Sequence, residues 1–286
     1  MSLDSNLIFT DPYSIQTHLI DHHHHGSHIG FVPTMGNLHQ GHLSLVETCA
    51  KHNDICVVSL FVNPLQFGPN EDFDSYPRSI KEDLHHLSAF PNLLIFNPKT
   101  TDIYPQGPAT HVHVPGLSER YCGQSRPQFF DGIANVIVRL FNIIRPNRAY
   151  FGEKDFQQLQ LIRQLVDDLF LPIDIIGCPT VRERSGLAMS SRNQYLSAEE
   201  AQQAPTIYRA LQTLNTLFSQ TQDSTTLLHC FHNYIQEHSD INIDYASIVS
   251  PKDLLPVHTA QADDRVLVAG TLGKTRLIDN IALSLR

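Results

Sequence analysis

Two histidines, three residues apart, follow a short apolar run and lie among glycines. The segment Pro33–His42 reads PTMGNLHQGH. Gly36 and Gly41 allow a ligand to approach the backbone without meeting a Cβ atom. If a helix starts here, its N–H groups and positive dipole end favour a phosphate, and His39 and His42 could both donate to the same anion. A purely structural turn with exposed histidines would give the same short pattern.

Three further groups of polar side chains follow other apolar runs. Gln66 lies in FVNPLQFG, and its amide could hold a hydroxyl or a carboxylate without adding charge. In GEKDFQQ, Lys154 offers a positive charge at a helix start, Asp155 could cap that helix, and Gln158 lies one turn further on. The segment at 189–193, MSSRN, places two hydroxyls beside an arginine, a set of donors suited to phosphate oxygens.

Two other clusters allow several interpretations. Glu82 and Asp83 could meet Mg²⁺ through water, but a solvated helix face is the simpler explanation of such a pair. The histidine run His22–His25 could bind a metal, be the remnant of a purification tag, or be a polar loop before the first strand. We expect the solvated loop and assign the run no function.

The elements that must position these residues alternate in the first part of the chain. Apolar runs predict strands at 29–32, 55–62, 93–96, 149–151 and 173–176, and helical patterns lie at 43–51, 79–89, 133–144 and 156–169. This alternation predicts βαβ units, a Rossmann-like parallel sheet and ligands at the carboxyl ends of its strands. Ser197 with Glu200 forms a capping-box pattern at the start of a helix.

Beyond residue 180 the pattern changes to helices followed by strands. Helices are expected at 197–218 and 225–238, and strands at 243–249, 266–269 and 276–278. We therefore expect an α/β fold of two domains: residues 1–180 as the Rossmann-like domain, and residues 181–286 as a smaller α+β domain. A linker is expected near 179–186.

The overall composition argues against several classes of protein. A formal net charge of -9 argues against a broad nucleic-acid-binding surface. The five cysteines lack paired spacing, as expected for reduced thiols, and no apolar run approaches the ~20 residues of a membrane-spanning helix. We read no signal peptide at the N-terminus and expect a cytoplasmic protein without membrane or nucleic-acid partners.

Taken together and in order, these motifs resemble the pantothenate synthetase (pantoate–β-alanine ligase) family of the nucleotidylyltransferase superfamily, which carries a His-x-Gly-His motif. The segment TLGKTRLIDN at 271–280 resembles the C-terminal signature of that family. The resemblance implies ATP-dependent joining of pantoate and β-alanine through a pantoyl adenylate, with Mg²⁺, a homodimer, and a lid-like second domain that closes over ATP.

The resemblance also implies roles for particular residues. The catalytic set would be His39, His42 and Lys154. The ATP-binding set would be Met35, Gly36, Asn37, Leu38, His39, Gln40, Gly41, His42, Gly152, Glu153, Lys154, Asp155, Val181, Met189, Ser190, Ser191 and Arg192. Gln66 and Gln158 would bind pantoate or β-alanine. No direct metal ligand can be named.

The sequence departs from the family pattern in three places. Asn37 stands where alanine is usual, Gln40 where glutamate is usual, and Gln128–Phe129 where Gly-His commonly follows Arg-Pro. We expect activity to survive the first two departures, and no role of that histidine is carried over to Phe129. The rival interpretations are a cytidylyl- or adenylyltransferase of the same superfamily and a non-catalytic nucleotide-binding protein.

Overall fold

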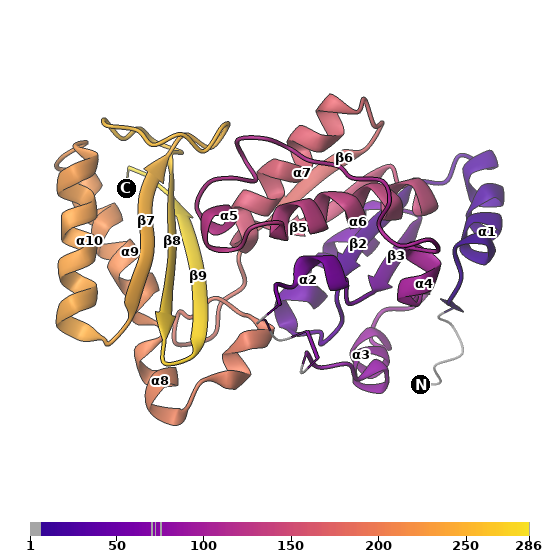
Figure 1. Cartoon of the computed structure of the whole chain (residues 1–286), viewed down its shortest axis with the longest axis horizontal. Helices are drawn as coiled ribbons and strands as arrows, with labels where there is room; N and C mark the ends of the chain where they lie inside the picture. The colour runs from indigo at the N-terminus through magenta and orange to yellow at the C-terminus, as the bar shows by residue number, and fades with distance from the viewer. Residues whose placement is uncertain (1–6, 70, 72, 75, 286) are drawn as a thin grey trace. The chain divides into compact units, whose positions relative to one another are not determined.

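The computed structural model describes residues 7–69, 71, 73–74 and 76–285 (Figure 1). The chain divides into two compact units. The first contains the residues up to Glu153 together with Leu161–Cys178, and the second contains Lys154–Gln160 together with the chain from Pro179 onward. Residues 154–160, at the start of a helix, therefore group with the C-terminal part of the chain. None of the described helices is long and apolar enough to cross a bilayer.

The first unit is built on a six-stranded parallel sheet with the order β1-β4-β3-β2-β5-β6. Its strands are β1 (Leu7–Phe9), β2 (Ile29–Thr34), β3 (Ile55–Leu60), β4 (Leu93–Phe96), β5 (Arg148–Gly152) and β6 (Asp174–Cys178). The central strands are buried along almost their whole length, because helices cover both faces of a parallel sheet. This arrangement confirms the expected Rossmann-like α/β fold.

The helices between these strands carry the candidate residues. They are α1 (Pro12–His24), α2 (Gln40–His52), α3 (Ile80–Leu87), α4 (Thr100–Ile103), α5 (Cys122–Ser125), α6 (Phe129–Ile144) and α7 (Phe156–Asp168), with 3₁₀ turns η2 (Pro64–Gln66) and η3 (Glu153–Asp155). Strand β2 pairs with β3 on one side and with β5 on the other. The connection that leaves β2 leads to β3, and the one that leaves β5 leads to β6, so the two run in opposite directions along the sheet. Ligands of open α/β sheets bind at such a point, beyond the carboxyl ends of the strands.

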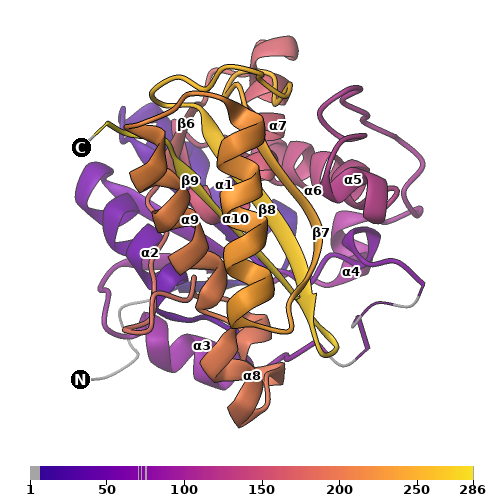
Figure 2. The same cartoon turned by 90° about the vertical axis from the view of Figure 1, so that its left-hand side faces the viewer.

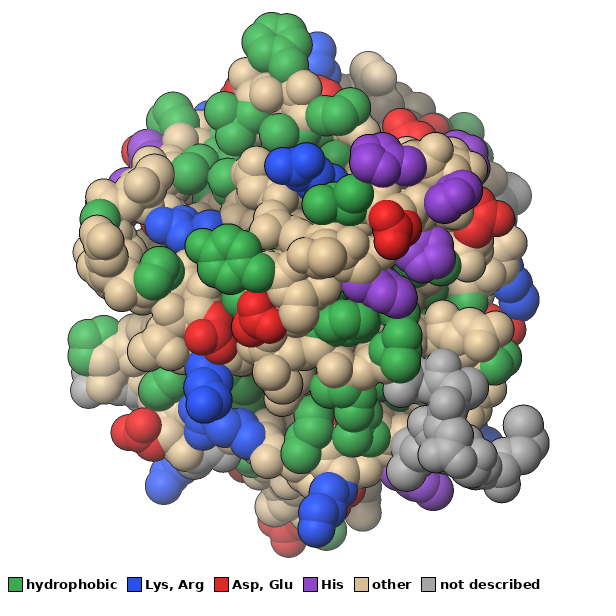
Figure 3. All heavy atoms as spheres, turned by 90° about the vertical axis from the view of Figure 1, so that its right-hand side faces the viewer, with side chains coloured by type: hydrophobic (Ala, Val, Ile, Leu, Met, Phe, Trp, Pro, Cys, Tyr) green, Lys and Arg blue, Asp and Glu red, His purple; other side chains and the backbone are tan. Residues whose placement is uncertain are grey.

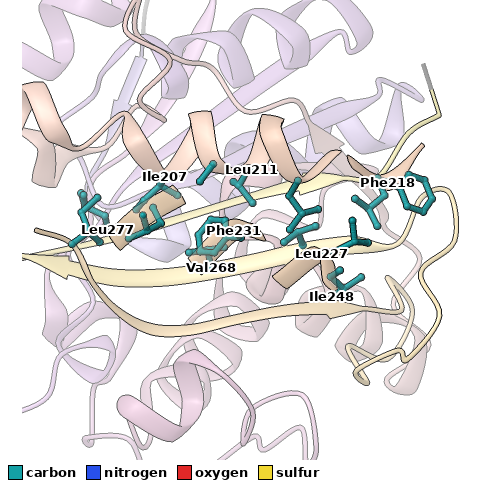
Figure 4. Close-up of a cluster of buried hydrophobic side chains, with 14 of the residues drawn as sticks. Ile207, Leu211, Phe218, Leu227, Phe231, Ile248, Val268 and Leu277 are labelled. Carbon is teal, nitrogen blue, oxygen red and sulfur yellow. The ribbon is translucent and has the colours of Figure 1, made fainter. Parts of the chain in front are cut away.

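The second unit packs helices against a three-stranded antiparallel sheet. The helices are α8 (Ala198–Gln203), α9 (Thr206–Phe218) and α10 (Ser224–His238), with the 3₁₀ turn η4 (Ser191–Tyr195), and the strands are β7 (Asn242–Val249), β8 (Arg265–Leu272) and β9 (Thr275–Ala282). Helices α9 and α10 lie side by side on one face of this sheet (Figure 2). Their apolar faces meet the sheet in a core that includes Leu211, Phe218, Phe231 and Val268 (Figure 4).

The structure corrects two expectations about helices. The helix expected at 197–218 is broken into α8 and α9, because Pro205 lacks an N–H donor and lies between them. The histidine run is not a loop: His22, His23 and His24 form the last turn of α1, and only His25 lies beyond it as the C-cap. Histidine side chains gather on one exposed face of the molecule (Figure 3), the side on which α1 lies in Figure 1.

The N-terminal edge strand β1 was not expected. It pairs in parallel with β4, Leu7 beside Leu94 and Phe9 beside Phe96. Its three residues are too few to show a period, which explains why the sequence pattern did not indicate it. The other strands agree with the expected ones to within about two residues at most ends, and those of the second sheet extend further.

Candidate active site

The two motif histidines lie at the start of α2 and face each other. His39 is the N-cap of the helix and His42 is in its first turn, with ring centroids 4.0 Å apart and the rings stacked. Nδ1 of His39 accepts the N–H of Gly41 at 3.1 Å, and Nδ1 of His42 accepts the N–H of His39 at 3.4 Å. A backbone N–H can only donate, so Nδ1 of each ring is an acceptor and Nε2 is the nitrogen that carries hydrogen. Both side chains are thereby arranged as Nε2–H donors.

The loop before the histidines is held from within the protein. The N–H groups of Asn37 and Leu38 donate to the carboxylate of Asp83, at 3.1 Å and 2.8 Å, and the N–H of Gly36 donates to the hydroxyl of Thr34. Gly36 has a φ of 79° and a Cβ there would lie 2.8 Å from Asp83, so glycine is required on both counts. These three N–H groups hold the fold of the loop that leads into His39.

The expectation that Glu82 and Asp83 both lie on a solvated helix face is wrong for Asp83. Its side chain is only 4% exposed, whereas Glu82 is exposed. Burial raises the pKa of the Asp83 carboxyl, although its two backbone donors act in the opposite direction. Nδ1 of His86, one turn further along α3, lies 3.0 Å from the carbonyl oxygen of Leu38. Two side chains of α3, Asp83 and His86, thus hold the backbone of the loop that precedes His39.

Gln66 lies at the end of η2, beyond the carboxyl end of β3. Its side-chain oxygen accepts an N–H from Asn63, whose side chain is fully buried. The same Asn63 amide donates to the carbonyl oxygen of Gly132 on α6. A Cβ on Gly132 would lie 2.1 Å from the carbonyl oxygen of Leu65, so this glycine allows α6 to pack directly on the turn. The position of Gln66 is therefore set by α6 as well as by β3.

Gln128 and Phe129, which stand where the family commonly has Gly-His, also lie in the first unit. Gln128 has a φ of 70°, the left-handed region that glycine adopts most easily. The Phe129 ring lies under the Arg126 guanidinium, 3.5 Å from the ring centroid. Arg126 also pairs with Glu71 and donates to the carbonyl oxygen of Gln66 at 3.1 Å. Phe129 thus supports the arginine that holds the backbone of Gln66.

The expected phosphate-binding lysine belongs to the second unit. Lys154 lies in η3, directly before α7, and its carbonyl oxygen accepts the side-chain N–H of Asn280 at 2.9 Å. Asp155 is the last residue of the same turn and is exposed, and Gln158 is half-buried on α7. Asn280 belongs to the C-terminal signature, so this signature holds the backbone of the Lys154 turn.

The neighbouring residue of the signature holds a second segment. Arg182 forms a two-pronged ion pair with the buried Asp279, at 2.6 Å and 2.9 Å, and its guanidinium lies over the Tyr208 ring. Arg182 pairs with Ala188 across a tight turn at Gly186, so the expected linker is a fixed hairpin-like loop. The carbonyl oxygen of Val181, at the base of this loop, accepts the N–H of Met189.

The Ser-Ser-Arg segment follows this loop as a 3₁₀ turn. Ser190 is the N-cap and accepts the N–H of Arg192, and Ser191 begins the turn. Asn193 ties the turn back to Glu183 and to the carbonyl oxygen of Ala188. Ser197 and Glu200 cap α8 reciprocally, which confirms the expected capping box.

The predicted residues are thus placed by unit. His39, His42 and Gln66 belong to the first unit, and Lys154, Gln158 and Arg192 belong to the second. The supporting roles of Asn63, Asp83 and Asp279 were not recognised from the sequence. Each is a buried polar residue with at least one partner far away in the sequence, and no local pattern indicates such a contact.

Among the described residues, no group of three or more histidine, cysteine, aspartate or glutamate side chains could hold a metal ion. This covers the histidine run and the Glu82–Asp83 pair. Each carboxylate oxygen of Asp83 accepts a backbone N–H, so this side chain serves the loop before His39.

Comparison with known proteins shows the family. The family model for pantoate-beta-alanine ligase matches residues 7–282. A pantothenate synthetase from Marinobacter nauticus is 47% identical over 275 residues, which cover 94% of this chain and 96% of that protein.

Solved structures of this family share the fold of the chain. A crystal structure of the Thermus thermophilus enzyme has a TM-score of 0.92 and 42% identity, and the match covers 97% of this chain and 99% of that one. The Francisella tularensis ligase, solved in complex with beta-gamma ATP and beta-alanine, has a TM-score of 0.81 and 35% identity over 98% of each chain. The chain therefore belongs to the pantoate–β-alanine ligase family.

Proposed function

We propose that the histidine pair, Gln66 and the Lys154 turn serve the ATP-dependent condensation of pantoate with β-alanine, which yields pantothenate, AMP and pyrophosphate. In the first step the pantoate carboxylate attacks the α-phosphorus of ATP, the bond to the bridging oxygen breaks, and pyrophosphate leaves. In the second step the β-alanine amine attacks the acyl carbon of the pantoyl adenylate, and AMP departs as the amine loses a proton.

The observation that carries this proposal is the arrangement of His39 and His42. Both rings accept at Nδ1, so both present an Nε2–H donor from one helix start. Two such donors stabilise the negative charge that develops on the departing pyrophosphate. We assign them this charge-stabilising role rather than that of proton donors, because pyrophosphate is a weakly basic leaving group.

The remaining roles follow the family resemblance. Residues 35–42, 152–155 and 189–192, with the backbone of Val181, are proposed to contact ATP, and Lys154 is proposed to pair with its phosphates. Gln66 and Gln158 are proposed to bind pantoate. The supporting contacts described above agree with these roles, because Asn63, Asp83 and Asn280 each hold one of these segments in place.

Magnesium is proposed to arrive as the ATP complex. The described carboxylates form no ion-binding cluster, and Mg²⁺ retains much of its water and is commonly held by substrate phosphates. We also propose, from the family, a cytoplasmic homodimer. Sedimentation at several concentrations tests the dimer, and a single 32.3 kDa species throughout would contradict it.

The direct test is AMP release from MgATP with pantoate and β-alanine together and with each omitted in turn. We expect AMP and pantothenate in equal amounts only when both are present. His42→Ala and Lys154→Ala should each slow adenylate formation by about two or more orders of magnitude while the far-UV and near-UV circular dichroism spectra stay unchanged.

The control for those variants is His52→Ala, since His52 lies at the other end of α2. Wild-type rates in His42→Ala or Lys154→Ala would remove the assigned roles. AMP formed with other acceptors but not with pantoate would favour the rival interpretation, a nucleotidyltransferase of the same superfamily.

A further inference from the structure

A buried chain of side-chain hydrogen bonds leads from Tyr104 to Gln66. The Tyr104 hydroxyl donates to Oδ1 of Asn63 at 2.9 Å, and Nδ2 of Asn63 donates to Oε1 of Gln66 at 3.0 Å. Tyr104 is 6% exposed and Asn63 is fully buried. Tyr104 follows α4, far along the chain from Gln66, and is in no motif that the sequence singled out.

The orientation of the Asn63 amide is fixed by two backbone groups. The carbonyl oxygen of Gly132 can only accept, so the atom 3.0 Å from it is the amide nitrogen. The N–H of Leu65 can only donate, so the atom 3.3 Å from it is the amide oxygen. The Tyr104 hydroxyl donates to the same oxygen. The second N–H of Asn63 then faces Gln66.

The orientation of the Asn63 amide determines which atom of the Gln66 amide faces Asn63. An N–H donor from Asn63 requires the oxygen of Gln66 on that side, so the nitrogen of Gln66, with its two N–H donors, lies on the other. Desolvation raises the pKa of Tyr104 to about 12, so the hydroxyl remains a protonated donor under all ordinary conditions. The Arg139 guanidinium lies 4.9 Å from the centre of the Tyr104 ring and acts weakly in the opposite direction.

We propose that Tyr104 is a positioning residue for pantoate recognition: through Asn63 it holds Gln66 with its NH₂ group, not its oxygen, toward the substrate. The site then offers donors to the oxygens of a 2-hydroxy carboxylate and disfavours a ligand that presents an N–H at that position. This inference rests on the proposed role of Gln66 in binding pantoate.

The first experiment compares Tyr104→Phe with a matched control. Tyr150 is also buried and its hydroxyl bonds to an asparagine side chain, Asn53, at 2.8 Å. We expect Tyr104→Phe to raise KM for pantoate about tenfold and to leave KM for ATP unchanged, and Tyr150→Phe to leave both unchanged. Equal changes in both KM values, or the same change in both variants, would show a general structural effect and overturn the proposal.

A double-mutant cycle separates positioning from packing. If Tyr104 acts through Gln66, Tyr104→Phe should have no further effect on KM for pantoate in a Gln66→Ala background. A full tenfold effect in that background would overturn the proposal. An unchanged KM in Gln66→Ala alone would instead remove the proposed pantoate site, so the two failures are distinguishable.

Gln66→Glu tests the orientation itself. The new carboxylate can still accept from Asn63, but it would place an oxygen without hydrogen toward the anionic substrate. We expect KM for pantoate to rise at least as much as in Gln66→Ala. A milder effect than that of alanine would show that the oxygen of Gln66 faces the substrate and would overturn the assignment.

Discussion

At the scale of single residues, Asp83 has an environment that its neighbours in sequence do not indicate. It follows Glu82 on a surface helix, yet its carboxylate is buried against the N–H groups of Asn37 and Leu38. Those two groups belong to the loop that leads into His39. Asp83 therefore acts on the position of the histidines without being one of the groups proposed to touch substrate.

Replacing Asp83 by alanine should leave two buried N–H groups without their acceptor. Because bonds to a charged acceptor are among the stronger ones, we expect the free energy of unfolding to fall by about 2–4 kcal/mol. KM for ATP should rise, since the loop before His39 loses its brace. Urea denaturation and initial-rate kinetics measure both effects.

Glu82→Ala is the matched control, because Glu82 is the exposed neighbour of Asp83 on the same helix. Its free energy of unfolding should change by no more than about 0.5 kcal/mol. If the two variants were equally stable, the brace provided by Asp83 would be refuted.

At the scale of elements, helix α6 meets the η2 turn without an intervening side chain. The contact depends on Gly132, whose missing Cβ leaves room for the carbonyl oxygen of Leu65. An alanine inside a helix normally stabilises it by about 1 kcal/mol relative to glycine. Here the steric conflict outweighs the propensity.

We therefore expect Gly132→Ala to destabilise the protein and to raise KM for pantoate, because η2 carries Gln66. Thermal unfolding and kinetics measure the two effects. Gly68→Ala is the control, since a Cβ at Gly68 would meet its nearest atoms at an ordinary 3.7 Å. An increase in stability in Gly132→Ala would show that the turn can move away at little cost.

The sequence predicts the helices and strands whose apolar residues recur at a regular spacing. It does not predict the contacts between residues that lie far apart in the chain. The buried runs of β3 and β4 and the apolar stripe of α6 were sufficient to predict the parallel sheet. The sequence pattern predicts one helix across Pro205, but the structure has two, because proline lacks the N–H that would continue the helix. The motif histidines were recognisable from spacing, whereas the hydrogen bond from Tyr104 to Asn63 spans 41 residues and has no local signature.

At the scale of the whole molecule, the thiols are distributed unevenly with respect to solvent. All five cysteines are free, four are buried, and Cys230 on α10 is half-exposed. Burial raises the pKa of the Cys178 thiol, and a neighbouring thiol, Cys49, together with burial raises that of Cys56 well above its usual value. The thiolate is the reactive form of cysteine. Cys56 and Cys178 should therefore react slowly with thiol reagents, both because they are buried and because their raised pKa keeps them as neutral thiols.

The native protein should thus react with one equivalent of a thiol reagent quickly and with the other four only after unfolding. Labelling at about pH 8, near the ordinary pKa of a thiol, followed by peptide mass spectrometry should place the fast site at Cys230. The fast phase should be absent in Cys230→Ser. Rapid labelling of Cys56 or Cys178 in the native state would contradict the burial of these thiols.

The capping of α2 by imidazole nitrogens limits what can replace the two histidines. Each ring must accept a backbone hydrogen on one nitrogen while it carries a hydrogen on the other. Lysine and arginine would bring a full positive charge to the phosphates, but neither has an acceptor. A side chain that only donates would leave the N–H groups of His39 and Gly41 without these partners. The start of α2 therefore requires, at both positions, a side chain that accepts on one nitrogen and donates on the other.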